Sequence, residues 1–469
     1  MPVSFTERQP SASPNASWAA RWLWLWCIAF ASLRLLGPGG FLYWDSFGYV
    51  AQAHRGDVGG LFLGRPFFVI TSQVVARVWL QTLGSVGTLE PALRAFWGMI
   101  SALAAPAVAE AARRYGAAPR AATVAGLVVA LSPAWANTAD AVLTDAPAMA
   151  LIALSYAVFG VSPSCSRLAL SGLLLGASVA TREPSATHAL LFVYWLSRQA
   201  PSRLPRIGVF ALSGLAIPAL SVCWSQLHTP DYWARFAAWR VAMRAEGLAH
   251  PWHVAELRWW FLWLVALSVA GLWGLLRWFR GAREARAVVY FNLAQLAALA
   301  FYQDVSFSPR YLLGAFAMGV ALPAGFGLAG VRRGCLAMVL VIPWALGGGL
   351  LAWRQRPLVR LLAEVPRRSE VAAERAEFWA GQSCGAIGWS ATLHAATRAR
   401  GLDWQRVCAG WGWPEDVEAR LRTSRRSGRQ VVLDLRPGAW PGARQEAARD
   451  ALERAWPRVF RPNELVIWR

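Results

Sequence analysis

The chain has 469 residues, of which 56% are hydrophobic and 28 are tryptophan, and its basic residues, all arginine, give a formal net charge of +21. Apolar runs of about 17–25 residues, long enough to cross a bilayer as helices, recur between residues 22 and 353 and indicate a polytopic membrane protein. Most arginines lie in short loops between these runs, which favours orientation in the membrane and lipid phosphates as their role and excludes nucleic acid as a partner.

The first apolar segment is predicted to be a retained span, 22–42. It is longer than the apolar part of a secretory signal and ends in "GPGGFLYWD" instead of a small-residue cleavage site. Asp45 follows where the chain leaves the membrane. The segment 66–84 carries Gln73 and Arg77 in its middle, a pattern that predicts a helix in the membrane interface. We therefore expect an external loop and interfacial helices over 43–91.

Charge placement then predicts about eleven spans in a membrane domain over residues 1–353. With 66–84 in the interface and the N-terminus inside, the arginine clusters fall in inside loops and most loop carboxylates fall outside. The ten spans after the first are 92–112, 121–137, 146–160, 168–181, 184–198, 207–226, 259–276, 287–303, 311–330 and 334–353. The resulting fold class is a mainly α, polytopic helical bundle.

Residues 354–469 are predicted to form a small extracytoplasmic α/β domain. The apolar runs "VVLDL" (431–435) and "NELVIW" (463–468) predict strands, and the segments "EVAAERAEFWA" (370–380) and "ARQEAARDALERAW" (443–456) predict helices. Cys384 and Cys408 lie in this polar tail, and whether they form a disulfide stays open because it depends on the compartment.

Polar residues that a bilayer disfavours gather on the predicted outer side. They are Asp45 after span 1, Asp140 and Asp145 before span 4, Arg182 and Glu183 after span 5, and Asp304, Ser308 and Arg310 before span 10. Charged side chains at this depth face partners or an aqueous cavity. Two simpler roles stay open: Asp145, two residues before a proline, as a helix cap, and Arg182 and Arg310 as arginines that reach for the membrane surface.

This set of groups suits a reaction on a lipid-linked phosphate. Asp45 can accept a proton from a nucleophilic hydroxyl, and Arg65, Arg182 and Arg310 can stabilise the departing phosphate. A phosphate is a good leaving group, so no nucleotide-binding loop is required. The sequence contains no Walker motif or GxGxxG.

The order of these segments resembles the GT-C membrane glycosyltransferases, specifically the branch of protein O-mannosyltransferases and bacterial lipid A aminoarabinose transferases. The resemblance covers residues 22–353. It rests on Asp45 with nearby Tyr49 after the first span, and then on "GRPFF", "LTDAPAMALIALSYAVF", "GLLLGASVATREPSA" and "SPRYLLGAFA" in this order.

The resemblance implies an inverting transfer of a hexose or pentose from a polyprenyl-phosphate donor to a lipid, glycan or protein acceptor outside the cytoplasmic (inner) membrane of the cell envelope. Asp45 matches the catalytic base and Asp145 a second acidic position. Tyr49, Arg65, Arg182 and Arg310 are the expected substrate- and phosphate-binding residues.

Two features depart from the family. Relatives often have two adjacent acids after the first span, whereas Ser46 follows Asp45 here, and Asp45 with Asp145 makes a thin site for a hard cation. We therefore predict no resident metal or other cofactor, although a divalent metal stays open. The alternative functions are a transporter or flippase of lipid-linked sugars and a catalytically inactive scaffold, but polar residues gathered at one face, without inverted repeats, favour the transferase.

Overall fold

The computed structural model describes most of the helical part of the chain and three short strands. The described residues are 25, 49–50, 52–53, 64–83, 89–132, 135, 138–139, 142–160, 163–198, 203–249, 283–301, 313–329, 331–332, 334–336, 338–342, 345, 376–379, 426, 430–434 and 465–468.

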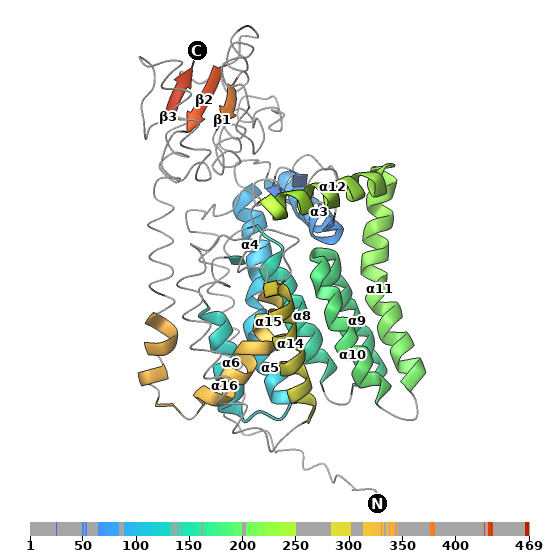
Figure 1. Ribbon diagram of the computed structural model, residues 1–469, viewed down its shortest axis with the longest axis vertical. Coiled ribbons are helices and arrows are strands. Elements are labelled where there is room, and N and C mark those ends of the chain that lie inside the picture. The colour runs from blue at the N-terminus through green and yellow to red at the C-terminus, as the bar shows by residue number, and fades with distance from the viewer. Residues whose placement is uncertain are drawn as a thin grey trace, which may run out of the picture.

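Most described helices run side by side along the long axis of the molecule (Figure 1). They are α4 (Leu89–Ala102), α5 (Ala104–Arg114), α6 (Pro119–Ala130), α8 (Asp145–Phe159), α9 (Cys165–Thr181), α10 (His188–Ser197), α11 (Arg203–His228), α14 (Arg283–Phe301), α15 (Leu313–Phe316), the π-helix η4 (Ala317–Ala321) and α16 (Leu322–Leu328). A short 3-10 helix, η2 (Glu183–Thr187), joins α9 to α10.

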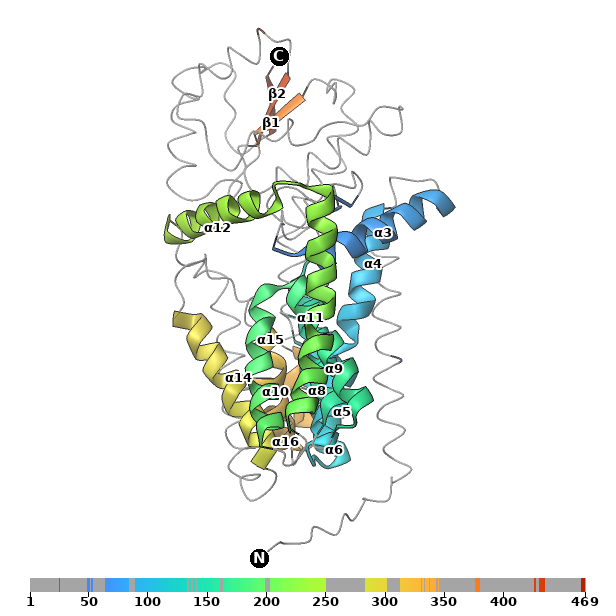
Figure 2. The ribbon, with the colours of Figure 1, turned by 90° about the vertical axis from the view of Figure 1, so that its right-hand side faces the viewer.

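Two further helices, α3 (Pro66–Leu83) and α12 (Tyr232–Ala249), lie across one end of this bundle (Figures 1 and 2). The orientation of α3 is the one expected for an interfacial helix at 66–84, whose place in a membrane stays a prediction. α12 begins shortly after α11 ends, so the chain turns sharply at Thr229–Asp231. We call the end of the bundle that carries α3 and α12 the upper end.

Local sequence signals explain where several helices begin and end. Gly116, with φ of 90°, and Gly160, with φ of 60°, follow α5 and α8, and glycine adopts this left-handed backbone without a Cβ clash. Pro119 opens α6, where its missing N–H has no intrahelical role. Ser164 caps α9 by accepting a hydrogen bond from the backbone N–H of Arg167 at 3.4 Å.

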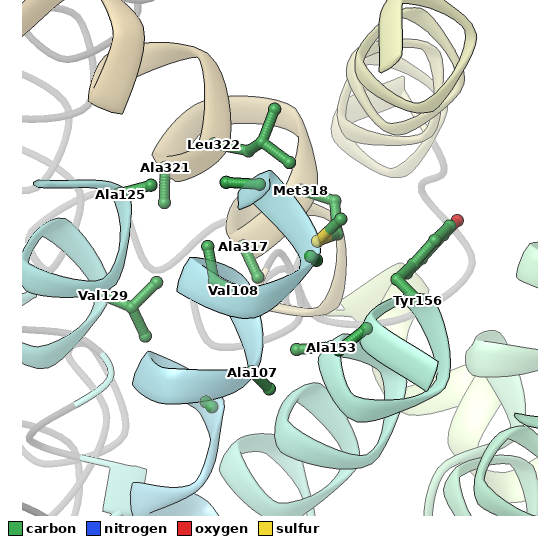
Figure 3. Close-up of a cluster of buried hydrophobic side chains, with 14 of the residues drawn as sticks. Ala107, Val108, Ala125, Val129, Ala153, Tyr156, Ala317, Met318, Ala321 and Leu322 are labelled. Carbon is green, nitrogen blue, oxygen red and sulfur yellow. The ribbon is translucent and has the colours of Figure 1, made fainter. Parts of the chain in front are cut away.

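The centre of the bundle is built from small apolar side chains (Figure 3). Ala107 and Val108 of α5, Ala125 and Val129 of α6, Ala153 of α8 and Ala317, Met318, Ala321 and Leu322 of η4 and α16 are buried together. A Cβ added at Gly325 would lie 2.6 Å from the carbonyl oxygen of Ala121, so α16 and α6 are in backbone contact. Small residues at such contacts are typical of helices that pack in a membrane, where close approach replaces the hydrophobic effect.

The same device fixes α9 against α11. A Cβ at Gly176 would lie 2.2 Å from the carbonyl oxygen of Gly214, and one at Gly172 would lie 2.5 Å from that of Phe210. Because α9 is locked to α11 here, its C-terminus, from which Arg182 projects, has a defined position. The opposite face of α11 is apolar and exposed, as Leu212 illustrates at 73%.

Span number stays a prediction for the chain as a whole. Among the described residues, Ala92–Arg114 and Arg203–His228 are long and apolar enough to cross a membrane, while 119–130, 145–159, 165–181 and 313–328 form shorter apolar helices. The predicted span 259–276 lies outside the described residues, as does 22–42 except for residue 25, and 334–353 is described only in part.

The strands form one three-stranded sheet in the order β1-β2-β3. β1 (Ala376–Trp379) pairs in parallel with β2 (Gln430–Asp434), and β2 pairs antiparallel with β3 (Leu465–Trp468). β2 and β3 overlap the strands predicted at 431–435 and 463–468. The helix predicted at 370–380 is wrong over 376–379, because Phe378 and Trp379, which favour strands, pair with Val432 and Leu433. The rest of the predicted α/β domain lies outside the described residues.

Candidate active site

The candidate site is centred on a buried ion pair at the upper end of the bundle. Asp145 is the first residue of α8 and Arg182 directly follows α9, and these neighbouring helices run in opposite directions. Arg182 Nη1 lies 2.8 Å from Asp145 Oδ1, with the two side chains 11% and 2% exposed. The two turns on either side of α8 and α9 therefore meet at one place.

Arg182 makes two different kinds of contact with the start of α8. Arg182 Nη1 donates a hydrogen bond to Thr144 Oγ1 at 3.3 Å. Asp145 Oδ1 accepts no directed hydrogen bond from the described residues, so its contact with Arg182 is chiefly electrostatic. Thr144 is the N-cap residue of α8 and makes no side-chain cap. Asp145 thus pairs with Arg182 and does not cap α8. Its negative charge also suits the positive N-terminal end of that helix.

Serine hydroxyl groups hold the two helices in the register that the pair requires. Ser178 Oγ donates to the carbonyl oxygen of Ala148 at 3.0 Å and lies 2.8 Å from Ser185 Oγ in η2. Further from the site, the hydroxyl groups of Ser155 and Ser171 each contact the other residue's carbonyl oxygen, at 2.9 and 3.0 Å. All four serines are buried, so these bonds form inside the bundle and stiffen the turn that carries Arg182.

A second polar pair joins Tyr49 to Arg65. Arg65 Nη1 donates a hydrogen bond to Tyr49 Oη, and Arg65 Cζ lies 5.9 Å from the centroid of the tyrosine ring. The Tyr49 ring packs edge-on against Phe68, which stacks on Trp97 with ring centroids 4.2 Å apart. This aromatic cluster fixes Arg65 at the start of α3.

The two pairs share a support. Val142, three residues before Asp145, is buried in the same cluster as Tyr49, Phe68 and Trp97. Of the predicted site residues, the structure therefore brings Asp145 to Arg182 and Tyr49 to Arg65, at the upper end of the bundle. Asp45 and Arg310 lie outside the described residues, as do Ser46, Asp140, Asp304 and Ser308.

Arg94 is a charged residue that the sequence analysis missed. It lies on α4 and is 1% exposed, one turn before Trp97, with the buried amides Gln52 and Gln73 in segments that join the same cluster. A buried guanidinium is destabilising unless it is paired, so it marks a site with a specific partner. The available signal was an arginine three residues inside the predicted span 92–112.

Two groups from the neighbouring turns complete the described surroundings. Glu183 follows Arg182 and is half-buried, and Tyr232, the first residue of α12, is 2% exposed. Burial, and then the charge of Glu183, raises the pKa of Tyr232 to about 12. The Tyr232 hydroxyl therefore stays protonated at neutral pH and remains a hydrogen-bond donor.

No metal-binding cluster occurs in the described part of the chain, where no three His, Cys, Asp or Glu side chains are grouped to hold an ion. His188 instead pairs with Tyr156, its Nδ1 lying 2.9 Å from the phenol oxygen. The described residues of the site thus combine arginines with a buried carboxylate. Asp45, which the sequence predicts to be the base, lies outside the described residues.

We compared the sequence and the structure of the chain with those of known proteins. No protein-family model matches the sequence, and no curated protein is significantly similar to it. In structure, the chain is similar to the protein O-mannosyltransferase Pmt1-Pmt2 complex of S. cerevisiae bound to the sugar donor, with 16% identity and a TM-score of 0.38. That match covers 47% of this chain and only 34% of the other.

The similarity to ArnT from Cupriavidus metallidurans covers the whole length. The apo structure of that protein matches with 14% identity and a TM-score of 0.60, covering 96% of this chain and 98% of ArnT. The structure of ArnT bound to undecaprenyl phosphate matches with 13% identity and a TM-score of 0.59, covering 97% and 98%. The chain therefore has the fold of ArnT, which agrees with the resemblance of its sequence motifs, in their order, to the GT-C membrane glycosyltransferases.

Proposed function

We propose that this chain is an integral-membrane glycosyltransferase that moves a sugar from a polyprenyl-phosphate donor to a lipid, glycan or protein acceptor. The observation that supports this most is the match over 97% of the chain to a structure that holds undecaprenyl phosphate. Buried charges at one end of the bundle agree with it, because a lipid-linked phosphate needs cations at the membrane surface.

In the proposed reaction, Asp45 accepts the proton of the acceptor hydroxyl as its oxygen attacks the anomeric carbon of the sugar. The bond between that carbon and the phosphate oxygen breaks on the opposite face, so the anomeric centre is inverted. The polyprenyl phosphate leaves with the bonding electron pair. Arg65 and Arg310 would stabilise the charge that develops on it.

The Asp145–Arg182 pair has a different role in this scheme. An arginine has five N–H donors, so one nitrogen can be held by Asp145 and Thr144 while others address a phosphate. Asp145 thus holds the Arg182 guanidinium in place, just as Tyr49 holds that of Arg65. Such preorganisation limits the reorganisation needed when the phosphate becomes charged.

Transfer itself is the direct test. The purified protein, reconstituted in liposomes, is supplied with undecaprenyl phosphate carrying mannose, glucose or 4-amino-4-deoxyarabinose and with a membrane-lipid extract as acceptor. We expect one of these lipids to lose its sugar and yield undecaprenyl phosphate, measured by mass spectrometry. Movement of every sugar-lipid across the bilayer without cleavage would instead identify a flippase.

The proposal also places the upper end of the bundle outside the cytoplasmic membrane. A membrane-impermeant maleimide applied to intact cells is expected to label cysteine at 231, in the turn before α12, and not at 283, where α14 begins. Native Cys165, Cys223 and Cys335 are exposed in the structure, so a cysteine-free background is required. Labelling at 283 alone would invert the orientation.

A further inference from the structure

Glu183 is a second acidic residue in the turn that carries Arg182. It follows Arg182 directly and is the first residue of η2. Its Oε2 atom is shielded from solvent and has no hydrogen-bond partner in the described part of the chain. A carboxylate oxygen that is removed from water without a donor is destabilising. A ligand with a hydrogen-bond donor would relieve this.

The turn that carries Glu183 is held rigidly. The backbone N–H of Arg182 donates to the carbonyl oxygen of Ser178 at 2.7 Å, and that of Ser185 donates to the carbonyl oxygen of Arg182 at 3.1 Å. With the Ser178–Ser185 hydroxyl contact, these bonds enclose Glu183 between fixed neighbours. The backbone that carries its carboxylate therefore has a defined position.

The charges around Glu183 indicate which part of a lipid-linked sugar could bind there. The Glu183 carboxylate, which is close enough to affect the ionisation of Tyr232 on α12, would repel a phosphate. Arg182, the neighbouring cation, contacts Asp145 and Thr144. In a polyprenyl-phosphate sugar, the groups that can donate a hydrogen bond to a carboxylate belong to the sugar, which lies one bond beyond the phosphate.

We propose that Glu183 accepts a hydrogen bond from a hydroxyl or ammonium group of the transferred sugar and thereby helps to determine which sugar is used. This inference rests on the proposed function, since it assumes that a lipid-linked phosphate lies at the arginines. Glu183 then discriminates between sugars by the position and charge of one donor group, because a buried acceptor left without its donor penalises the wrong sugar.

The test compares two lipids on one variant, Glu183→Gln. Affinity is measured for undecaprenyl phosphate and for the same lipid carrying whichever of the three sugars above the protein transfers. We expect the affinity for the bare lipid to stay the same or to rise slightly, because a carboxylate that repels the phosphate is removed. Affinity for the sugar-lipid should fall about tenfold if a neutral hydroxyl is bound and about a hundredfold if an ammonium is bound, because the amide keeps the acceptor but loses the charge.

Glu110→Gln is the matched control. Glu110 lies near the other end of the bundle on α5 and already contacts Arg113 and Arg114 at 2.7 and 2.6 Å, so the variant should bind both lipids as the unmodified protein does. Equal weakening of both lipids by Glu183→Gln, or no weakening of either, would overturn the inference. A lowered Tm for Glu183→Gln would also overturn it, because it would give the carboxylate a structural role.

Failure of the proposed function looks different from failure of this inference. If the chain does not use polyprenyl-phosphate donors, the unmodified protein binds neither lipid, whatever residue stands at 183. If it uses them without help from Glu183, the unmodified protein and Glu183→Gln bind the sugar-lipid equally. The measurement on the unmodified protein therefore comes first.

Discussion

Replacing Asp45 with asparagine is expected to reduce sugar transfer by about 10²–10⁴-fold, the range typical of a lost general base. Asparagine has nearly the same shape as aspartate but cannot accept the proton of the acceptor hydroxyl. Because this proton moves only in the transition state, kcat should fall while affinity for undecaprenyl phosphate stays the same or rises slightly, since a carboxylate that repels the phosphate is removed. Single-turnover transfer and lipid binding measure the two effects separately.

Asp231→Asn is the control for this experiment. Asp231 is an exposed aspartate in the turn before α12, on the same predicted side of the membrane, and its Oδ2 accepts a hydrogen bond from Arg235 Nε at 3.0 Å. That bond lowers the pKa of Asp231, so the control also removes an ionised carboxylate. Transfer by Asp231→Asn should stay within about twofold of the original rate, as for other exposed substitutions. If Asp45→Asn behaves like this control, Asp45 is not the base.

The candidate site was predictable from the sequence as a set of residues on one side, but not as a set of contacts. Hydropathy and arginine placement predict that Asp145 and Arg182 occupy turns on the same face. Their ion pair depends on the register of α8 against α9. That register is fixed by the Ser155–Ser171 contact and the Ser178 hydroxyl, which look like ordinary polar interruptions in the sequence.

Fold was predictable in the same partial way. The helical bundle follows from the length of the apolar runs, and the helix at 66–83 from an apolar segment that carries Gln73 and Arg77 in its middle. The strand at 376–379 did not, because alanine and glutamate dominate 370–377 and outweigh the two aromatic residues in any local pattern. Arg94 was missed for a related reason: a single charge near the end of an apolar run resembles a residue that reaches for the membrane surface, and only packing against the Tyr49–Trp97 cluster shows its burial.

The ion pair offers the second large expected effect. Asp145→Ala leaves the Arg182 guanidinium, 11% exposed, without its carboxylate. Breaking a buried pair by removing one partner costs about 3–5 kcal/mol, so we expect a marked fall in Tm and in transfer. Arg182→Gln should be destabilising for the same reason, since it leaves Asp145 buried and charged. Thermal unfolding in detergent and transfer by the folded fraction measure both properties.

The double variant separates pairing from two independent roles. Once Asp145 is alanine, Arg182→Gln removes a guanidinium that has already lost its contact with Asp145, so it should destabilise far less than in the original protein, with a coupling free energy of about 1–3 kcal/mol. Simple additivity of the two destabilisations would mean that Asp145 acts alone at the start of α8.

Arg182→Lys then separates the effect on catalysis from the effect on stability. Lysine keeps the charge beside Asp145 but loses the planar guanidinium. A stable protein that transfers slowly would therefore show that the fork geometry of Arg182 serves the phosphate.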